Sequence, residues 1–157
     1  MSNSLDQLKE PEELAVFIGR WRAEGASYGG TDQSGEDPRA NGVPWTSEHS
    51  AYWYSGEFFM VQDERAMTGD APFDTLWVMG RDAGEERMFA RTFENHGHCR
   101  DYHLKRDGNV WTISGATERA TIRFRNDNRE QVITWEWKPD DRWLPLCDRI
   151  AAKIEEE

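Results

Sequence analysis

The stretch "HGHCRDYHL", residues 96–104, contains three of the four histidines of the chain and one of its two cysteines. Imidazole and thiolate groups are common zinc ligands, and an imidazole titrates near neutral pH and can transfer protons. In an extended strand, successive side chains point to opposite faces. Counting by two from His98 puts Arg100 and Tyr102 on its face, whereas Cys99 and His103 fall on the other. One strand therefore cannot bring all these groups to one point.

Three interpretations of these histidines stay open. The first is a polar strand with histidines at turns or on the surface, because "NHG" has turn composition and places His96 in a loop. The second is a metal site that combines His98 with the distant His49 or a carboxylate, and the third is proton transfer by one histidine. We predict the first, and so expect no bound zinc, no haem and no other cofactor. The sequence contains no nucleophile-elbow motif and no phosphate-binding loop motif.

The aromatic residues offer a second kind of chemistry, the binding of a small molecule. Ligand pockets are mostly apolar and aromatic, with a few placed polar groups. The candidates for the apolar wall are Trp53, Phe59, Trp77, Phe93, Trp111 and Trp135. The candidates for polar contacts are Arg91, His98, Arg100 and Tyr102. An arginine inside a barrel would suit a carboxylate, although each of these rings could also be plain core and each arginine could face solvent.

The elements that position these residues follow from the hydrophobic period. Leu14, Phe17 and Ile18 have helical spacing, which predicts a short helix over about 11–18 that Gly19 ends. From there the period becomes two, and it is cleanest in "RATIRFR", where Ala120 and Ile122 share a face. The predicted strands lie within about 20–154, at 20–28, 46–54, 57–67, 74–80, 87–95, 98–106, 109–115, 119–126, 130–138 and 143–154.

The connections predict how these strands pair. Short turns rich in Gly, Asn and Asp separate them, and no helix intervenes, so the sheet is antiparallel. Residues 29–45 form a long irregular connection, and Ser55-Gly56 reads as a two-residue hairpin turn. Regular hairpins favour an all-β, up-and-down barrel of about 8–10 strands, with a sandwich as the alternative. The last segment fits a strand better than a helix, because Pro145 is awkward in a helix interior.

Composition narrows the class of protein. The 157 residues suffice for one domain, 1–157. A net charge of −11 disfavours nucleic acid as a partner. No apolar run approaches the roughly 20 residues that span a bilayer, so no membrane contact is expected. The polar N-terminus is unlike a signal peptide, and two cysteines make no disulfide framework, so we expect a cytoplasmic protein with free thiols.

Several motifs carry a resemblance to known proteins. "GRWRAEG" (19–25) is similar to the Gly-x-Trp opening of lipocalins and nitrobindins, which have calycin barrels. The longer pattern of "GEFFMVQDE", "FDTLWVMGRD", "RTFENHGHCRDY", "GNVWTISG" and "TWEWKPDDRW" resembles a bacterial domain-of-unknown-function family with a lipocalin-like barrel, over about residues 12–154. Nitrobindins carry haem on a late histidine, and no histidine follows His103 here.

The lipocalin resemblance also implies a structural pair. In that family the first-strand tryptophan closes the barrel floor beneath a basic side chain from the end of the last strand. Here Trp21 would take the first role. Arg149, or alternatively Lys153, would take the second, with Phe17 of the N-terminal helix covering the same end.

Three functions are compatible with this sequence. The first, which we favour, is a barrel that binds a small apolar or amphipathic molecule. The second is an enzyme on the same barrel that uses a cavity histidine for proton transfer. The third is a homodimeric interaction protein with a filled barrel and an apolar outer patch. The sequence does not identify a ligand.

Overall fold

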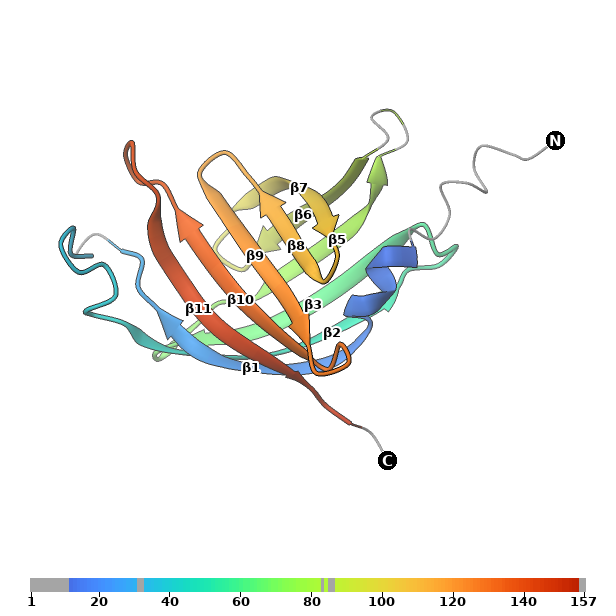
Figure 1. The fold of residues 1–157 in the computed structure, drawn as a ribbon, viewed down its shortest axis with the longest axis horizontal. Helices are drawn as coiled ribbons and strands as arrows, with labels where there is room; N and C mark the ends of the chain where they lie inside the picture. The colour runs from blue at the N-terminus through green and yellow to red at the C-terminus, as the bar shows by residue number, and fades with distance from the viewer. Residues whose placement is uncertain (1–11, 31–32, 83, 85–86, 156–157) are drawn as a thin grey trace.

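A short helix and eleven strands make up the chain in the computed structural model, which describes residues 12–30, 33–82, 84 and 87–155 (Figure 1). The helix, η1 (Glu12–Phe17), is a 3₁₀ helix at the predicted place, and residue 11 lies outside the described residues. The strands are β1 (Gly19–Ser27), β2 (Val43–Trp53), β3 (Phe59–Thr68), β4 (Ala71–Pro72), β5 (Thr75–Asp82), β6 (Arg87–Glu94), β7 (Cys99–Asp107), β8 (Val110–Ser114), β9 (Glu118–Arg125), β10 (Glu130–Trp137) and β11 (Leu144–Lys153).

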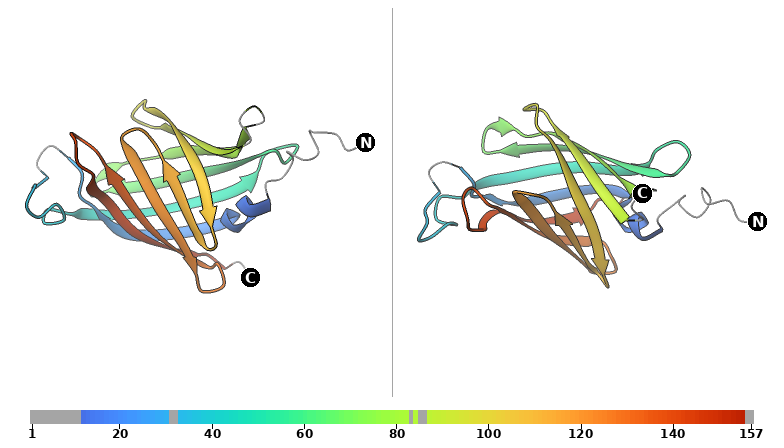
Figure 2. Two further views of the ribbon diagram at one scale, coloured as in Figure 1. Left: turned by 45° about the horizontal axis from the view of Figure 1, so that its top comes forward. Right: turned by 90° about the horizontal axis from the view of Figure 1, so that it is seen from above.

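Within the described residues, ten of these strands close into one antiparallel barrel. The order is β2-β1-β11-β10-β9-β8-β7-β6-β5-β3, and β2 pairs with β3 to complete the ring. Among the residues that the structure describes, the two-residue strand β4 pairs only with the end of β3. Figure 2 shows the same strands from two further directions. The antiparallel barrel predicted from the hairpin pattern is confirmed, and the sandwich alternative is wrong.

Two predicted connections differ from the structure. The turn between β2 and β3 is longer than two residues, because the N–H of Tyr54 donates to the carbonyl of Phe59 at 2.8 Å across a four-residue loop. Gly56 and Glu57 in that loop both have positive φ, at 90° and 62°. The long connection ends at Gly42 rather than 45, since β2 already begins at Val43. Residues 144–153 form a strand, as predicted.

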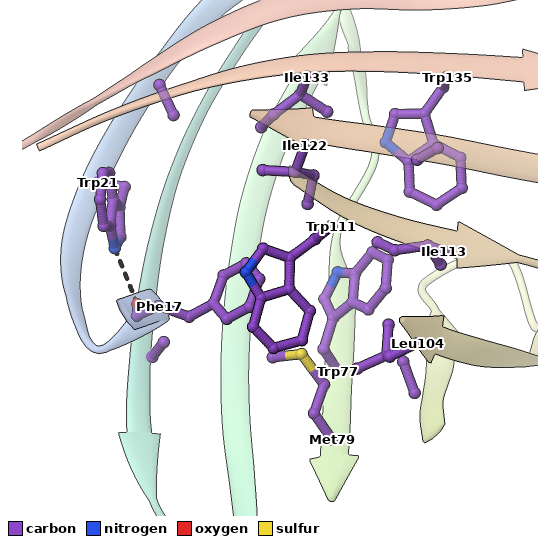
Figure 3. Packing of buried hydrophobic residues seen from close by; sticks show 14 of the residues in the cluster. Phe17, Trp21, Trp77, Met79, Leu104, Trp111, Ile113, Ile122, Ile133 and Trp135 are labelled. Carbon is purple, nitrogen blue, oxygen red and sulfur yellow. Dashed lines mark hydrogen bonds between the residues drawn. The ribbon is translucent and has the colours of Figure 1, made fainter. Parts of the chain in front are cut away.

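One end of the barrel is closed by η1 and large rings. Trp21 is fully buried and donates its indole N–H to the carbonyl of Phe17 at 2.9 Å (Figure 3). The Phe17 ring packs edge-on against Trp111 and Phe124, with centroids 5.0 and 5.2 Å away. Leu14 is also fully buried in this cluster. The predicted floor, with Trp21 and the helix at one end, is therefore present.

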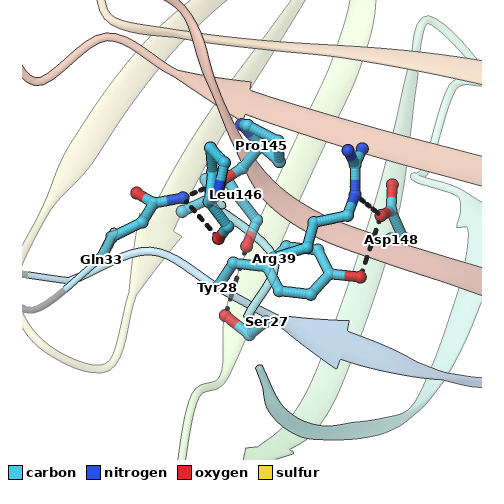
Figure 4. A network of polar contacts seen from close by, with 8 residues as sticks. Ser27, Tyr28, Gln33, Arg39, Pro145, Leu146 and Asp148 are labelled. Carbon is cyan, nitrogen blue, oxygen red and sulfur yellow. Dashed lines mark hydrogen bonds and ion pairs between the residues drawn. The ribbon is translucent and has the colours of Figure 1, made fainter. Parts of the chain in front are cut away.

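The other end carries the long connection between β1 and β2, opposite η1 in Figures 1 and 2. Polar contacts tie it to β11. Asp148 accepts hydrogen bonds from the Tyr28 hydroxyl at 3.0 Å and from Arg39 Nε at 2.8 Å (Figure 4). Gln33 donates to the carbonyl of Pro145 at 2.7 Å and accepts from the indole of Trp137 at 2.7 Å. These contacts fix the rim around the open end.

Candidate functional site

A cavity of about 580 Å³ lies inside the barrel and reaches the end with the β1–β2 connection. That volume is within the range of small-molecule pockets. Its rim includes Ser27, Gly29, His96, His98 and Leu146, and its interior includes the apolar rings of Trp45, Phe73, Trp77 and Trp135. A smaller space of about 30 Å³ lies deeper, and Glu64, Trp77, Trp135 and Arg149 border both. These four residues therefore form the floor of the outer cavity.

The aromatic wall is a contiguous set of rings from well-separated strands. Trp77 of β5 stacks on Tyr102 of β7, with centroids 6.1 Å apart and ring planes 23° apart. Trp135 of β10 contacts both rings, at 6.0 and 5.8 Å. Across the cavity, Trp45 lies against Phe73 at 5.7 Å. Aromatic pairs at these distances stabilise the wall beyond the area that the rings bury.

A buried ion pair lies at the cavity floor. Arg149 Nη1 of β11 is 3.5 Å from Glu64 Oε2 of β3, and both side chains are only 8% exposed. The guanidinium carbon of Arg149 is also 4.2 Å from the centroid of the Trp45 ring, a cation–π contact. Strand β1 makes room for it, since Gly25 lies opposite Arg149 and a Cβ there would come within 1.9 Å of backbone.

Several buried polar atoms around this floor have no hydrogen-bond partner among the described residues. They include Nε and Nη1 of Arg149, the indole Nε1 of Trp77 and Oγ1 of Thr92. Trp77, Thr92 and Arg149 all line the cavity. Protein atoms cover each of these four atoms, so they lie within the cavity wall, and leaving them unpaired there costs free energy.

A second polar cluster lies nearer the rim. Arg100 Nε is 3.1 Å from Glu94, and Arg100 Nη1 is 2.9 Å from Glu118, so one guanidinium bridges two carboxylates. The Tyr102 hydroxyl lies 3.5 Å from the same Glu118 oxygen. Burial raises the pKa of Glu118, and burial, together with the charge of Glu118, raises the pKa of Tyr102. Both groups thus hold their protons more tightly than in water.

His49 lies deeper, at the inner space. Its ring stacks on Trp21, with centroids 6.2 Å apart, and its Nδ1 has no partner among the described residues. Burial lowers the pKa of His49 to about 4, aided by the charge of Arg149 and opposed by that of Glu64. The imidazole is therefore neutral at physiological pH.

The structure places four of the predicted ligand-binding residues together in this cavity, and His98 at its rim. The four are Trp77, Arg100, Tyr102 and Trp135. Trp111 is instead buried at the closed end against Phe17, and Trp53 packs half-buried against the core without lining the cavity.

The remaining three predicted residues, Phe59, Arg91 and Phe93, point away from the interior. Arg91 pairs with Asp101 of β7 at 2.7 Å and lies over the Phe93 ring, on the outer surface. Phe59 and Phe93 are each 41% exposed. Strand alternation explains this, because their neighbours Met60, Thr92 and Glu94 occupy the inward positions.

The histidine-rich stretch does not converge on one point. His96 packs against Phe73 at the rim, His98 lines the opening, and His103 is exposed on the outer face of β7. Among the described residues, no group of three or more His, Cys, Asp or Glu side chains could hold a metal ion. His103 therefore points to the outside of the barrel and not into the cavity.

The predicted partner of Trp21 is wrong. Trp21 is opposite Lys153 in the β1–β11 register, and Lys153 Nζ lies 5.7 Å from its ring centroid. Arg149 is four residues before Lys153 on β11, opposite Gly25, and lies over Trp45 instead. The alternative residue, Lys153, therefore takes this position.

Sequence reasoning missed Trp45, Glu64, Phe73, Glu94, Glu118 and the cavity position of Arg149. The alternation of side chains along each strand could have indicated these residues. In "VQDERAM", Glu64 shares a face with Ala66, and in "RTFEN", Glu94 shares a face with Thr92. Polar residues on the inward face are unusual for a packed core and indicate a cavity.

A larger surface groove of about 1050 Å³ lies outside the barrel at the closed end. Residues of η1, of two hairpin turns and of the C-terminal segment line it, many of them charged. Within the described ranges, no helix has the length and apolar character that crossing a membrane requires.

The fold is similar to that of one protein of solved structure. The S-type phycobiliprotein lyase CPES from Guillardia theta aligns over 96% of this chain and 96% of its own, with a TM-score of 0.57 and 11% sequence identity. The likeness is one of fold. No protein-family model and no curated protein sequence matches this chain. The barrel fold expected from the resemblance is supported, whereas the bacterial family suggested by the residue pattern gains no support.

Proposed function

We propose that this protein binds a small amphipathic molecule inside its barrel. The observation that carries the proposal is the cavity of about 580 Å³, open at one end and lined by Trp45, Trp77 and Trp135. Its wall combines apolar rings with a few buried hydrogen-bonding groups, which is the composition of small-molecule sites. Fold similarity adds only that a barrel of this kind occurs in a protein of a different sequence.

Binding fits the polar groups better than proton transfer does. A catalytic acid or base must be free to reach a substrate. Here Glu118 is held by Arg100 at 2.9 Å, and Glu94 by the same guanidinium at 3.1 Å. His49 is 4% exposed and stacked on Trp21 beneath the cavity floor. The interior is also not filled, which disfavours a purely structural barrel.

Native mass spectrometry of the gently purified protein tests this proposal first, since a bound molecule adds its mass to the chain. A titration with the neutral dye phenylnaphthylamine follows. We expect one dye per chain, with quenching of tryptophan emission as the dye enters among the rings. Unchanged emission at dye saturation, together with an unliganded mass, would count against a binding function.

A further inference from the structure

The charge of the Arg149–Glu64 pair bears on which molecules the cavity accepts. We propose that Glu64 is a specificity-determining residue, and that the cavity takes an uncharged amphipathic ligand and excludes the matching carboxylate. This inference rests on the proposed function and adds to it the chemical class of the ligand. An isolated buried arginine would favour an anion, whereas this arginine already has its counter-charge.

The count of charges around the cavity supports this selectivity. The cavity is lined by three carboxylates, Glu64, Glu94 and Glu118, and by two guanidiniums, Arg100 and Arg149. Each guanidinium lies within 3.5 Å of at least one of these carboxylates. The other basic side chains of the described lining, His96 and His98, lie at the rim, so a ligand carboxylate at the floor would meet Glu64 with no further cation beside it. Because such charges interact strongly away from bulk water, the second anion is disfavoured.

The floor offers little unpaired charge to a ligand. Protein atoms cover Arg149 Nε, Arg149 Nη1 and Trp77 Nε1, so these donors lie within the wall, and Nη1 is 3.5 Å from Glu64 Oε2. Arg149 as a whole is only 8% exposed. An uncharged polar group, such as an amide, meets this neutral ion pair without bringing a net charge. An aromatic or similarly flat apolar body would occupy the space between Trp45, Trp77 and Trp135.

A matched pair of probes tests the inference on the whole protein. Pyrenebutyric acid and pyrenebutyramide share the same apolar body and carbonyl, and at pH 7 only the acid is charged. Their dissociation constants are measured by calorimetry. We expect the amide to bind wild type at least about tenfold more tightly than the acid, because Glu64 repels the carboxylate. Equal or tighter binding of the acid would overturn the inference.

The variant Glu64→Gln removes the negative charge and keeps the shape of the side chain. We expect it to strengthen binding of the acid at least about tenfold and to change binding of the amide by less than about threefold. Asp63→Asn is the matched control, because Asp63 is the adjacent residue of β3, points outward and pairs with Arg65 at 2.8 Å. It changes the net charge equally and should leave the ratio of the two affinities unchanged.

Arg149→Met is an independent test, since it removes the counter-charge and leaves Glu64. We expect this variant to show no gain in binding of the acid over wild type. If Glu64→Gln does not fold, the ratio of the two dissociation constants in wild type and the result for Arg149→Met still test the inference. If neither probe binds wild type, the proposed function itself fails. If both bind but Glu64→Gln leaves their ratio unchanged, the binding function stands and the role of Glu64 is refuted.

Discussion

The ammonium nitrogen of Lys153 lies 5.7 Å from the centroid of the Trp21 ring, at the closed end of the barrel. Trp21 is fully buried, and its indole donates to the Phe17 carbonyl, so it joins β1 to η1. Trp21→Ala should lower the free energy of unfolding by about 3–5 kcal/mol, through lost transfer energy and a cavity. Lys153→Ala should cost about 0.5–1 kcal/mol, as expected for a cation on an indole face at a partly exposed site. Chemical denaturation measures both.

A double-mutant cycle supplies the control for this pair. Because the two side chains are in contact, their combined effect should differ from the sum of the single effects. Arg149→Ala combined with Trp21→Ala should be additive, since Arg149 lies on Trp45 instead. Additivity for Lys153 and coupling for Arg149 would contradict the register described above.

His49 makes stability sensitive to acid. Its pKa in the folded protein is about 4, lowered by burial, against about 6.5 in an unfolded chain. Between these pH values the unfolded chain takes up a proton that the folded chain does not, so stability falls as pH falls from 6.5 towards 4. The free energy of unfolding falls by about 3 kcal/mol through His49 over this pH range. His49→Gln should therefore lose less stability than wild type over this window in denaturation at several pH values. Parallel curves for the two proteins would show that His49 does not titrate this way.

Arg100 should stabilise the rim by holding two carboxylates. Arg100→Met leaves Glu94 and Glu118 next to each other without a cation, which should cost about 1–3 kcal/mol at neutral pH. Burial already raises the pKa of Glu118, and losing Arg100 raises it further. The folded variant then binds a proton more readily than its unfolded chain, so part of the lost stability should return on acidification.

The control for Arg100 is Arg91→Met, which breaks the exposed pair with Asp101 on the outer surface. Exposed pairs contribute little, so this change should cost less than about 1 kcal/mol and show no recovery in acid. Equal losses for the two variants in thermal unfolding would mean that the rim cluster has no special role.

The two cysteines should differ in reactivity. Cys99 is exposed, whereas Cys147 is 5% exposed, lines the cavity and has its pKa raised by burial. Since the thiolate is the reactive form, one thiol should react rapidly with a disulfide reagent and the other slowly. In a Cys99→Ser variant, only the slow phase should remain, and a bound dye should slow it further. A rapid phase in that variant would place Cys147 outside the cavity wall.

The sequence predicted the barrel because alternation and turn composition are local properties of each strand. "RATIRFR" became β9, with Ala120, Ile122 and Phe124 all buried, as its period of two predicts. The two-residue β4 was not predicted, because "AP" has no period to detect. The 3₁₀ form of η1 was also missed, since apolar spacing in six residues does not separate it from an α-helix.

The candidate site was predicted less well, for a physical reason. We assigned aromatic side chains to the barrel interior, and this assignment is wrong in strands whose inward face carries polar residues. In β6 the inward residues are Thr92 and Glu94, and Phe93 faces out. The position of Arg149 depends on the register between β1 and β11, which pairs it with Gly25. Register is set by long-range pairing and cannot be read from either strand alone.

The central claim is that the cavity is the binding site, and a cavity-filling variant tests it most directly. Thr92 is 2% exposed and lines the cavity, whereas Thr121 of β9 is exposed on the outer face. Phenylnaphthylamine is titrated into wild type, Thr92→Phe and the control Thr121→Phe, following the emission of the dye. We predict that wild type and Thr121→Phe bind one dye per chain with equal affinity, and that Thr92→Phe binds at least about tenfold more weakly while still unfolding cooperatively. Undiminished binding by a folded Thr92→Phe would contradict the account, because the dye would then lie outside the barrel.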